Sequence, residues 1–179
     1  MSDGAPLSVL LRERIVIDER GLGNMWPVFY DSELFAQVVG AMAAPFEARV
    51  DKIVGIESRG FVLGAAVAAR LEVGFVAIRK SDGLYPGETV SADTAEDYRG
   101  RRHTFRLQRA ALREGERVGL VDDWFETGSQ GLIARALVEQ AGGTYAGASI
   151  IVDQLPPERR RELEPCHALI AASELNFVS

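Results

Sequence analysis

Residues 118–130 read Val118-Gly119-Leu120-Val121-Asp122-Asp123-Trp124-Phe125-Glu126-Thr127-Gly128-Ser129-Gln130. The apolar run up to Val121 predicts a buried strand, and the alternation that follows Gly128 predicts a helix over 128–140. Between them we expect a loop over 122–127 that begins with two carboxylates. A strand, a polar turn and a helix in this order are typical of an α/β domain, in which ligands bind at the carboxyl edge of the sheet.

This stretch has the chemistry of a site for a phosphorylated sugar. Free backbone N–H groups at Gly128 and Ser129 predict an anion site at the start of the helix, where glycine lets a phosphate approach closely. Asp122 and Asp123 would repel a bare anion, but they could accept hydrogen bonds from sugar hydroxyls or help to hold a metal. The alternative is a solvated acid pair with Thr127 as a helix cap, and the whole constellation favours the functional interpretation.

The rest of the chain predicts an α/β fold with a mostly parallel central sheet flanked by helices. A strand over 52–56, a turn over 57–60, a helix over 61–71 and a strand over 74–78 form a parallel crossover. Residues 81–100 are polar and long for a connection, and residues 104–108 predict the returning strand of a hairpin. Further strands are expected at 117–121, 145–152 and 168–171, and further helices at 5–20, 32–42 and 157–163.

Composition limits the functional classes. The 179 residues, 47% of them apolar, suit a single domain over 1–179 with a sizeable core. No apolar run reaches the length of a membrane span, and the single cysteine, Cys166, favours a cytoplasmic location and a packing role. A formal net charge of −6 argues against broad nucleic-acid binding but not against a small anionic ligand.

Residues 118–130 resemble the phosphoribosyl pyrophosphate (PRPP) signature of the type I phosphoribosyltransferases. The resemblance implies that Asp122 and Asp123 bind the ribose hydroxyls of PRPP. It also implies that the loop after them binds the 5′-phosphate, and this loop comprises Glu126, Thr127, Gly128, Ser129 and Gln130. The similarity spans roughly residues 53–140 well and the termini poorly.

Two further segments resemble the adenine phosphoribosyltransferases within that family. Gly55-Ile56-Glu57-Ser58-Arg59-Gly60-Phe61 resembles the segment that meets pyrophosphate, which implies roles for Ser58 and Arg59 and a non-proline cis bond at Ser58-Arg59. Ile78-Arg79-Lys80 implies that Arg79 and Lys80 face the same pyrophosphate. The alternative for both arginines is an ordinary place on the surface.

The resemblance implies a pentosyltransferase that moves the phosphoribosyl group of PRPP to a purine-like, adenine-type base and releases pyrophosphate. Mg²⁺ would enter with PRPP, and the protein would be a homodimer. Residues 1–30 or so would form a hood near the base, and residues 81–103 a mobile loop that excludes water. Asp97, with Arg59, would take the catalytic role, and Glu96 is the rival for proton handling.

Three departures from the family pattern concern the base. A Phe-Arg-Asp stretch that helps to bind adenine is missing from the matching loop, residues 21–26. Trp124 replaces an aliphatic residue that lies against the base, and it could either stack on the base or pack into the core or a dimer. Glu126 replaces a small residue beside the phosphate loop and would point away from a phosphate or meet Arg99 or Arg101.

Two alternatives therefore stay open. The same chemistry could act on a specialised base other than adenine, so that adenine would be a poor substrate. The fold could instead serve a non-catalytic sensor of PRPP or nucleotides. The acid pair, Arg59 and Arg79 favour catalysis, because a sensor does not need the pyrophosphate side.

Overall fold

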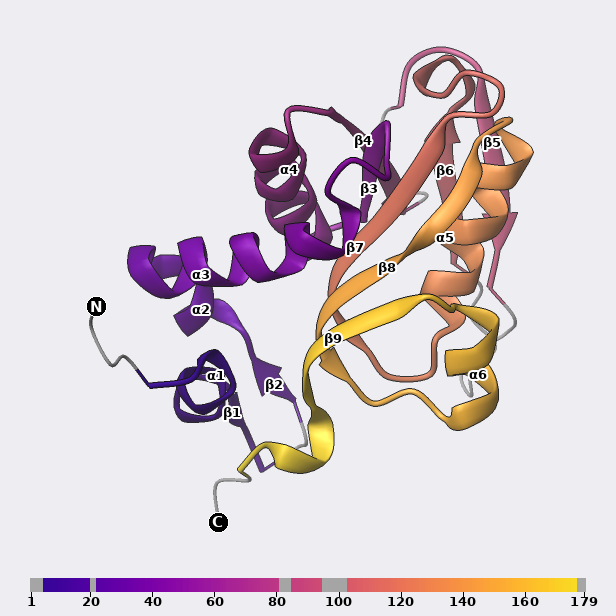
Figure 1. Ribbon diagram of the computed structural model, residues 1–179. Helices are drawn as coiled ribbons and strands as arrows, with labels where there is room; N and C mark the ends of the chain where they lie inside the picture. Colours follow the sequence, from indigo (N-terminus) through magenta and orange to yellow (C-terminus); the bar gives the residue numbers. More distant parts are fainter. Residues whose placement is uncertain (1–4, 20–21, 81–84, 95–102, 177–179) are drawn as a thin grey trace.

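A seven-stranded sheet forms the centre of the computed structural model, which describes residues 5–19, 22–80, 85–94 and 103–176 (Figure 1). The strand order is β5-β6-β4-β3-β7-β8-β9. The strands are β3 (Lys52–Ile56), β4 (Gly74–Lys80), β5 (Thr89–Asp93), β6 (Thr104–Gln108), β7 (Arg117–Phe125), β8 (Thr144–Asp153) and β9 (Cys166–Ala171).

The sheet is mostly parallel, as the sequence predicts. Strands β4, β3, β7, β8 and β9 run parallel to one another, whereas β5 and β6 form an antiparallel hairpin beside β4. Because β3, β7 and β8 are parallel neighbours, the residues that follow them meet at one edge of the sheet.

Helices cover both faces of this sheet (Figure 1). Helix α4 packs on β3 and β7 with α3 beside it, and α5 packs on the opposite face. A hydrophobic core lies on each face of the sheet, and successive side chains of β3 point into opposite cores. Ile53 packs in the core on the α4 side and Val54 in the core on the α5 side. The helices are α1 (Leu7–Arg14), α2 (Trp26–Tyr30), α3 (Ser32–Ala43), α4 (Arg59–Leu71), α5 (Ser129–Gln140) and α6 (Pro157–Glu162).

The N-terminal part adds a small antiparallel sheet of β1 (Val16–Ile17) and β2 (Gly23–Asn24). This segment brings Gly23 against the ring of Trp124 at the end of β7. It therefore places the loop that precedes α2 beside the carboxyl edge of the main sheet.

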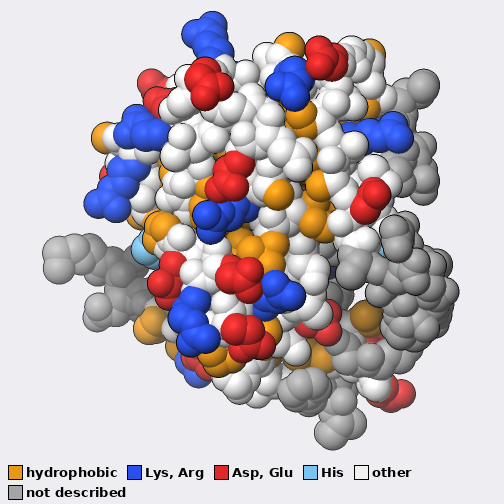
Figure 2. Space-filling model, turned by 90° about the vertical axis from the view of Figure 1, so that its right-hand side faces the viewer, with side chains coloured by type: hydrophobic (Ala, Val, Ile, Leu, Met, Phe, Trp, Pro, Cys, Tyr) orange, Lys and Arg blue, Asp and Glu red, His pale blue; other side chains and the backbone are white. Residues whose placement is uncertain are grey.

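Acidic and basic side chains are mixed on the face of the molecule seen in Figure 2. Ion pairs also form along the helices, such as Arg135 with Glu139 on α5 and Arg159 with Glu162 on α6. Among the described residues, no helix is long and apolar enough to span a bilayer. Cys166 is buried, and this burial raises the pKa of its thiol, in keeping with a packing role.

Four sequence-based expectations are corrected. The helix predicted over 5–20 ends at Arg14, and strand β1 follows it. The loop predicted over 122–127 is wrong, because β7 continues through both acids to Phe125 and stays paired with β8 as far as Asp153. The connection predicted over 81–100 contains β5, which pairs with β6. The non-proline cis peptide lies at Glu57-Ser58 and not at Ser58-Arg59.

Candidate active site

Two adjoining cavities open at the carboxyl edge of the sheet, with volumes of about 630 Å³ and about 300 Å³. Arg59, Trp124 and Gln130 line both of them, so the cavities share one wall. Their combined size suits a small-molecule ligand. The larger cavity is also lined by Leu22, Gly23, Phe125, Glu126, Thr127, Gly128, Ser129 and Gln154, and the smaller one by Trp26, Glu57, Ser58, Lys80, Asp122 and Asp123.

The acid pair is buried at the base of the smaller cavity. Asp122 is 8% exposed and Asp123 5% exposed. The Asp123 backbone N–H donates to Asp122 Oδ1 at 2.9 Å, and Arg59 Nε lies 2.8 Å from Asp123 Oδ2. Burial, and then the neighbouring charge of Asp123, raise the pKa of Asp122 well above its usual value. Hydroxyl donors from a bound ligand would add hydrogen bonds to these buried carboxylates.

The predicted phosphate loop forms one wall of the larger cavity, because all five residues from Glu126 to Gln130 line it. Gly128 has φ +76°, and a Cβ there would lie 2.8 Å from Leu155 Cδ2, so this turn requires glycine. Thr127 Oγ1 accepts from the Ser129 backbone N–H at 3.4 Å and holds the start of α5. The arrangement presents a helix N-terminus to the cavity, where an anion is favoured.

Three of the four residues predicted to meet pyrophosphate line the smaller cavity: Ser58, Arg59 and Lys80. Arg79 does not line the smaller cavity. Its Nη2 lies 3.5 Å from Glu57 Oε1. Glu57 also accepts from the Lys80 backbone N–H at 2.9 Å, which ties the turn before α4 to the end of β4.

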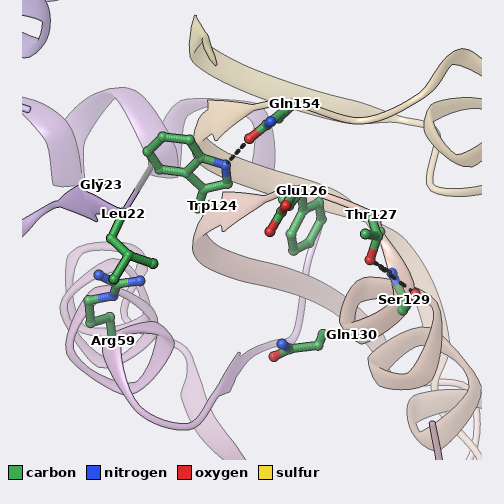
Figure 3. Close-up of a pocket in the computed structure, with 11 residues that line it drawn as sticks. Leu22, Gly23, Arg59, Trp124, Glu126, Thr127, Ser129, Gln130 and Gln154 are labelled. Atoms are coloured by element: carbon green, nitrogen blue, oxygen red, sulfur yellow. Dashed lines mark hydrogen bonds between the residues drawn. The ribbon is translucent and has the colours of Figure 1, made fainter. Parts of the chain in front are cut away.

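Trp124 lines both cavities, and Figure 3 shows its indole ring beside Gln154. Its indole Nε1 donates to Gln154 Oε1 at 2.9 Å. A Cβ on Gly23 would lie 2.5 Å from the ring, so the ring fits only beside a glycine. The half-buried ring also packs against the core on the α4 side, which is one of the two places that the sequence left open, and stacking on a base stays a prediction.

Six residues that line the cavities were not among the predicted site residues: Leu22, Gly23, Trp26, Glu57, Phe125 and Gln154. Gln154 follows β8, so the rule that sites gather at the carboxyl ends of parallel strands could have found it. Asp97 and Glu96, the candidates for proton handling, lie outside the described residues, as do Arg99 and Arg101.

Comparisons with known proteins agree with this geometry. Residues 29–154 match the model of the phosphoribosyl transferase domain. The chain is 38% identical to an adenine phosphoribosyltransferase of Cereibacter sphaeroides over 149 residues, covering 80% of this chain and 82% of the relative. A solved adenine phosphoribosyltransferase of Rhodothermus marinus matches with a TM-score of 0.80 and 30% identity, over 92% of this chain and 98% of that one.

A Saccharomyces cerevisiae adenine phosphoribosyltransferase, solved with adenine and an imino-altritol bisphosphate, matches with a TM-score of 0.74 and 32% identity over 83% of this chain and 86% of its own. Both the sequence and the architecture are thus similar to those of proteins of one kind. The chain belongs to the phosphoribosyl transferase family, among relatives named adenine phosphoribosyltransferases.

Proposed function

We propose that the protein transfers the phosphoribosyl group of PRPP to a ring nitrogen of an adenine-type purine and releases pyrophosphate. The observation that carries the proposal is that Asp122 and Asp123 line one cavity with Arg59 and Lys80, beside an adjoining cavity that the predicted phosphate loop lines. This arrangement matches the three parts of PRPP, which are a 5′-phosphate, a ribose diol and a pyrophosphate. The named relatives support the same chemistry.

Positioning and charge stabilisation would supply the catalysis. Positive charge develops on the ribose as the bond to pyrophosphate breaks, and Asp122 and Asp123 lie beside the place of that sugar. Arg59 and Lys80 would stabilise the leaving pyrophosphate, with Arg79 aligned through Glu57. Arg59 would exchange its contact with Asp123 for pyrophosphate oxygens, while ribose hydroxyls take over the acid.

Mg²⁺ would enter with PRPP. Two carboxylates at an open cavity fit the usual way in which Mg²⁺ takes one or two protein oxygens and completes its shell with phosphates and water. Bound there, Mg²⁺ would neutralise charge on the pyrophosphate. Asp122 and Asp123 are the carboxylates that would help to hold it.

The loop over 81–103 is proposed to close over the reacting groups, with Asp97 as proton acceptor, and most of it lies outside the described residues. Its length and polarity support the proposal. Hydrogen exchange in this segment should slow when PRPP and Mg²⁺ are added. Full protection in the free protein would contradict a closing loop.

A homodimer in the cytoplasm is the proposed working form. The exposed aromatic rings of Trp26 and Tyr30 give α2 an apolar outer surface that a second copy could cover. Light scattering after size-exclusion chromatography measures the assembly. The acidic net charge supports small-molecule substrates over nucleic acid.

The decisive experiment is titration calorimetry with PRPP and Mg²⁺, followed by assay of pyrophosphate release over a panel of bases. Wild type should bind, and the Asp122→Asn/Asp123→Asn double variant should lose binding by roughly a hundredfold, as expected for two lost charge-assisted contacts. Unchanged binding in the double variant would refute the site. Binding without pyrophosphate release for any base would favour the sensor instead, and better turnover of another base than of adenine would favour the specialised-base alternative.

A further inference from the structure

Three side chains beyond the acid pair line the larger cavity together. Trp124 is the penultimate residue of β7, and Glu126 follows directly after the strand. Phe125 pairs with Asp153, and the Gln154 backbone N–H donates to Phe125 O at 2.9 Å, which places Gln154 next to Glu126. All three line the larger cavity (Figure 3).

The hydrogen bond from Trp124 fixes the polarity of Gln154. An indole Nε1 can only donate, so the Gln154 oxygen must face it. The other atom of the amide, Nε2, is then a hydrogen-bond donor that points away from the indole Nε1. Among the described residues, no protein acceptor receives a hydrogen bond from it. Gln154 therefore offers a hydrogen-bond donor beside the indole ring.

Glu126 offers the complementary acceptor. Its side chain is exposed in the cavity, and no described cation pairs with it. A carboxylate in a phosphate loop repels a phosphate, so Glu126 suits a ligand group other than the 5′-phosphate. A hydrogen-bond donor on the same ligand, such as an exocyclic amine, would suit it.

We infer that Glu126 and Gln154 are specificity-determining residues that read the edge of the base while Trp124 supports its face. Glu126 accepts from the exocyclic amino group of an aminopurine, and Gln154 Nε2 donates to the adjacent ring nitrogen. This donor and acceptor replace the recognition that the missing Phe-Arg-Asp stretch would have given. The inference rests on the proposed function, and it names the substrate class as purines with an amino group beside a ring nitrogen.

The test for Glu126 pairs a variant with a truncated substrate. Glu126→Met should lower kcat/KM for adenine at least about tenfold, the size expected for a lost hydrogen bond to a charged group. With unsubstituted purine, which lacks the amino group, the same variant should change kcat/KM less than about twofold. Glu139→Met removes the same charge from the outer face of α5 and should leave both substrates unchanged.

The test for Gln154 uses Gln154→Glu, which keeps an oxygen for the indole and removes the donor. The KM for adenine should rise about tenfold while the affinity for PRPP stays within about twofold. The indole N–H resonance of Trp124 should keep its position in NMR spectra. Gln154→Met, which removes both atoms, should shift that resonance as well.

Equal losses with adenine and purine in Glu126→Met, or an effect on PRPP affinity alone, would overturn the inference and assign Glu126 to the phosphate loop. An unchanged KM for adenine in Gln154→Glu would overturn the part played by Gln154. Failure of the wild type to bind PRPP or to release pyrophosphate would refute the proposed function itself. Because that result precedes any variant, the two failures are distinguishable.

Discussion

At the scale of single residues, the buried acid pair serves ligand binding but lowers the stability of the free protein. The pKa of Asp122 is raised chiefly by burial and then by Asp123, so the folded state holds a proton that the unfolded state releases at lower pH. The contribution of Asp122 to the stability of the free protein should therefore be greatest below its unfolded pKa and be lost as pH rises through the folded pKa.

Asp122→Asn should remove that decline and raise the free energy of unfolding at pH 7, while it weakens PRPP binding. Urea unfolding at several pH values, with calorimetry, measures both effects. A variant less stable than wild type at neutral pH would contradict the interpretation.

Arg59 is the residue whose partner should change between the free and bound states. It now lies against Asp123, and at the start of α4 it also faces the smaller cavity. Arg59→Ala should weaken binding of PRPP and pyrophosphate about tenfold or more, and binding of ribose 5-phosphate much less. Calorimetry with the three ligands decides, and Arg135→Ala on α5 is a control distant from the cavities. Equal weakening of all three ligands would assign Arg59 to the fold.

At the scale of elements, the passage from β7 into α5 builds the phosphate loop. Gly128→Ala should force a residue with a Cβ into a positive φ and against Leu155. The variant should lose about 1–2 kcal/mol, which lowers Tm by about 2–8 °C for a chain of this size. Its affinity for ribose 5-phosphate should fall too, because the start of α5 moves. Thermal unfolding measures the Tm of the variant, and calorimetry measures its affinity for ribose 5-phosphate. An unchanged Tm and an unchanged affinity would show that the loop tolerates a side chain.

The same passage shows what could be predicted from sequence. Apolar runs predict β3, β7 and β8 because buried parallel strands are continuous in hydrophobicity. The end of β7 was missed because two acids resemble a turn, whereas ladder pairing with β8 continues the strand through them. Gln154 carried no motif of its own, and only the register between β7 and β8 brings it beside Glu126.

At the scale of the whole molecule, the site joins elements from distant parts of the chain. β2, the turn before α4, the end of β4 and the passage from β7 to α5 all meet at one edge. A ligand that spans both cavities would contact each of them, so its binding energy adds to the stability of the entire fold. Because the net charge of the protein is acidic, binding of an anionic ligand depends on the cationic side chains at the site and not on a general attraction for anions.

PRPP with Mg²⁺ at a hundred times its dissociation constant should add about 2.7 kcal/mol to the free energy of unfolding. For a single domain of this size the corresponding rise in Tm is about 5–11 °C. Ribose 5-phosphate at the same concentration should give a smaller rise because it leaves the pyrophosphate side empty, and the Asp122→Asn/Asp123→Asn variant should give almost none. Differential scanning calorimetry over a range of ligand concentrations tests this, since a rise that does not follow concentration would mean that PRPP acts outside a defined site.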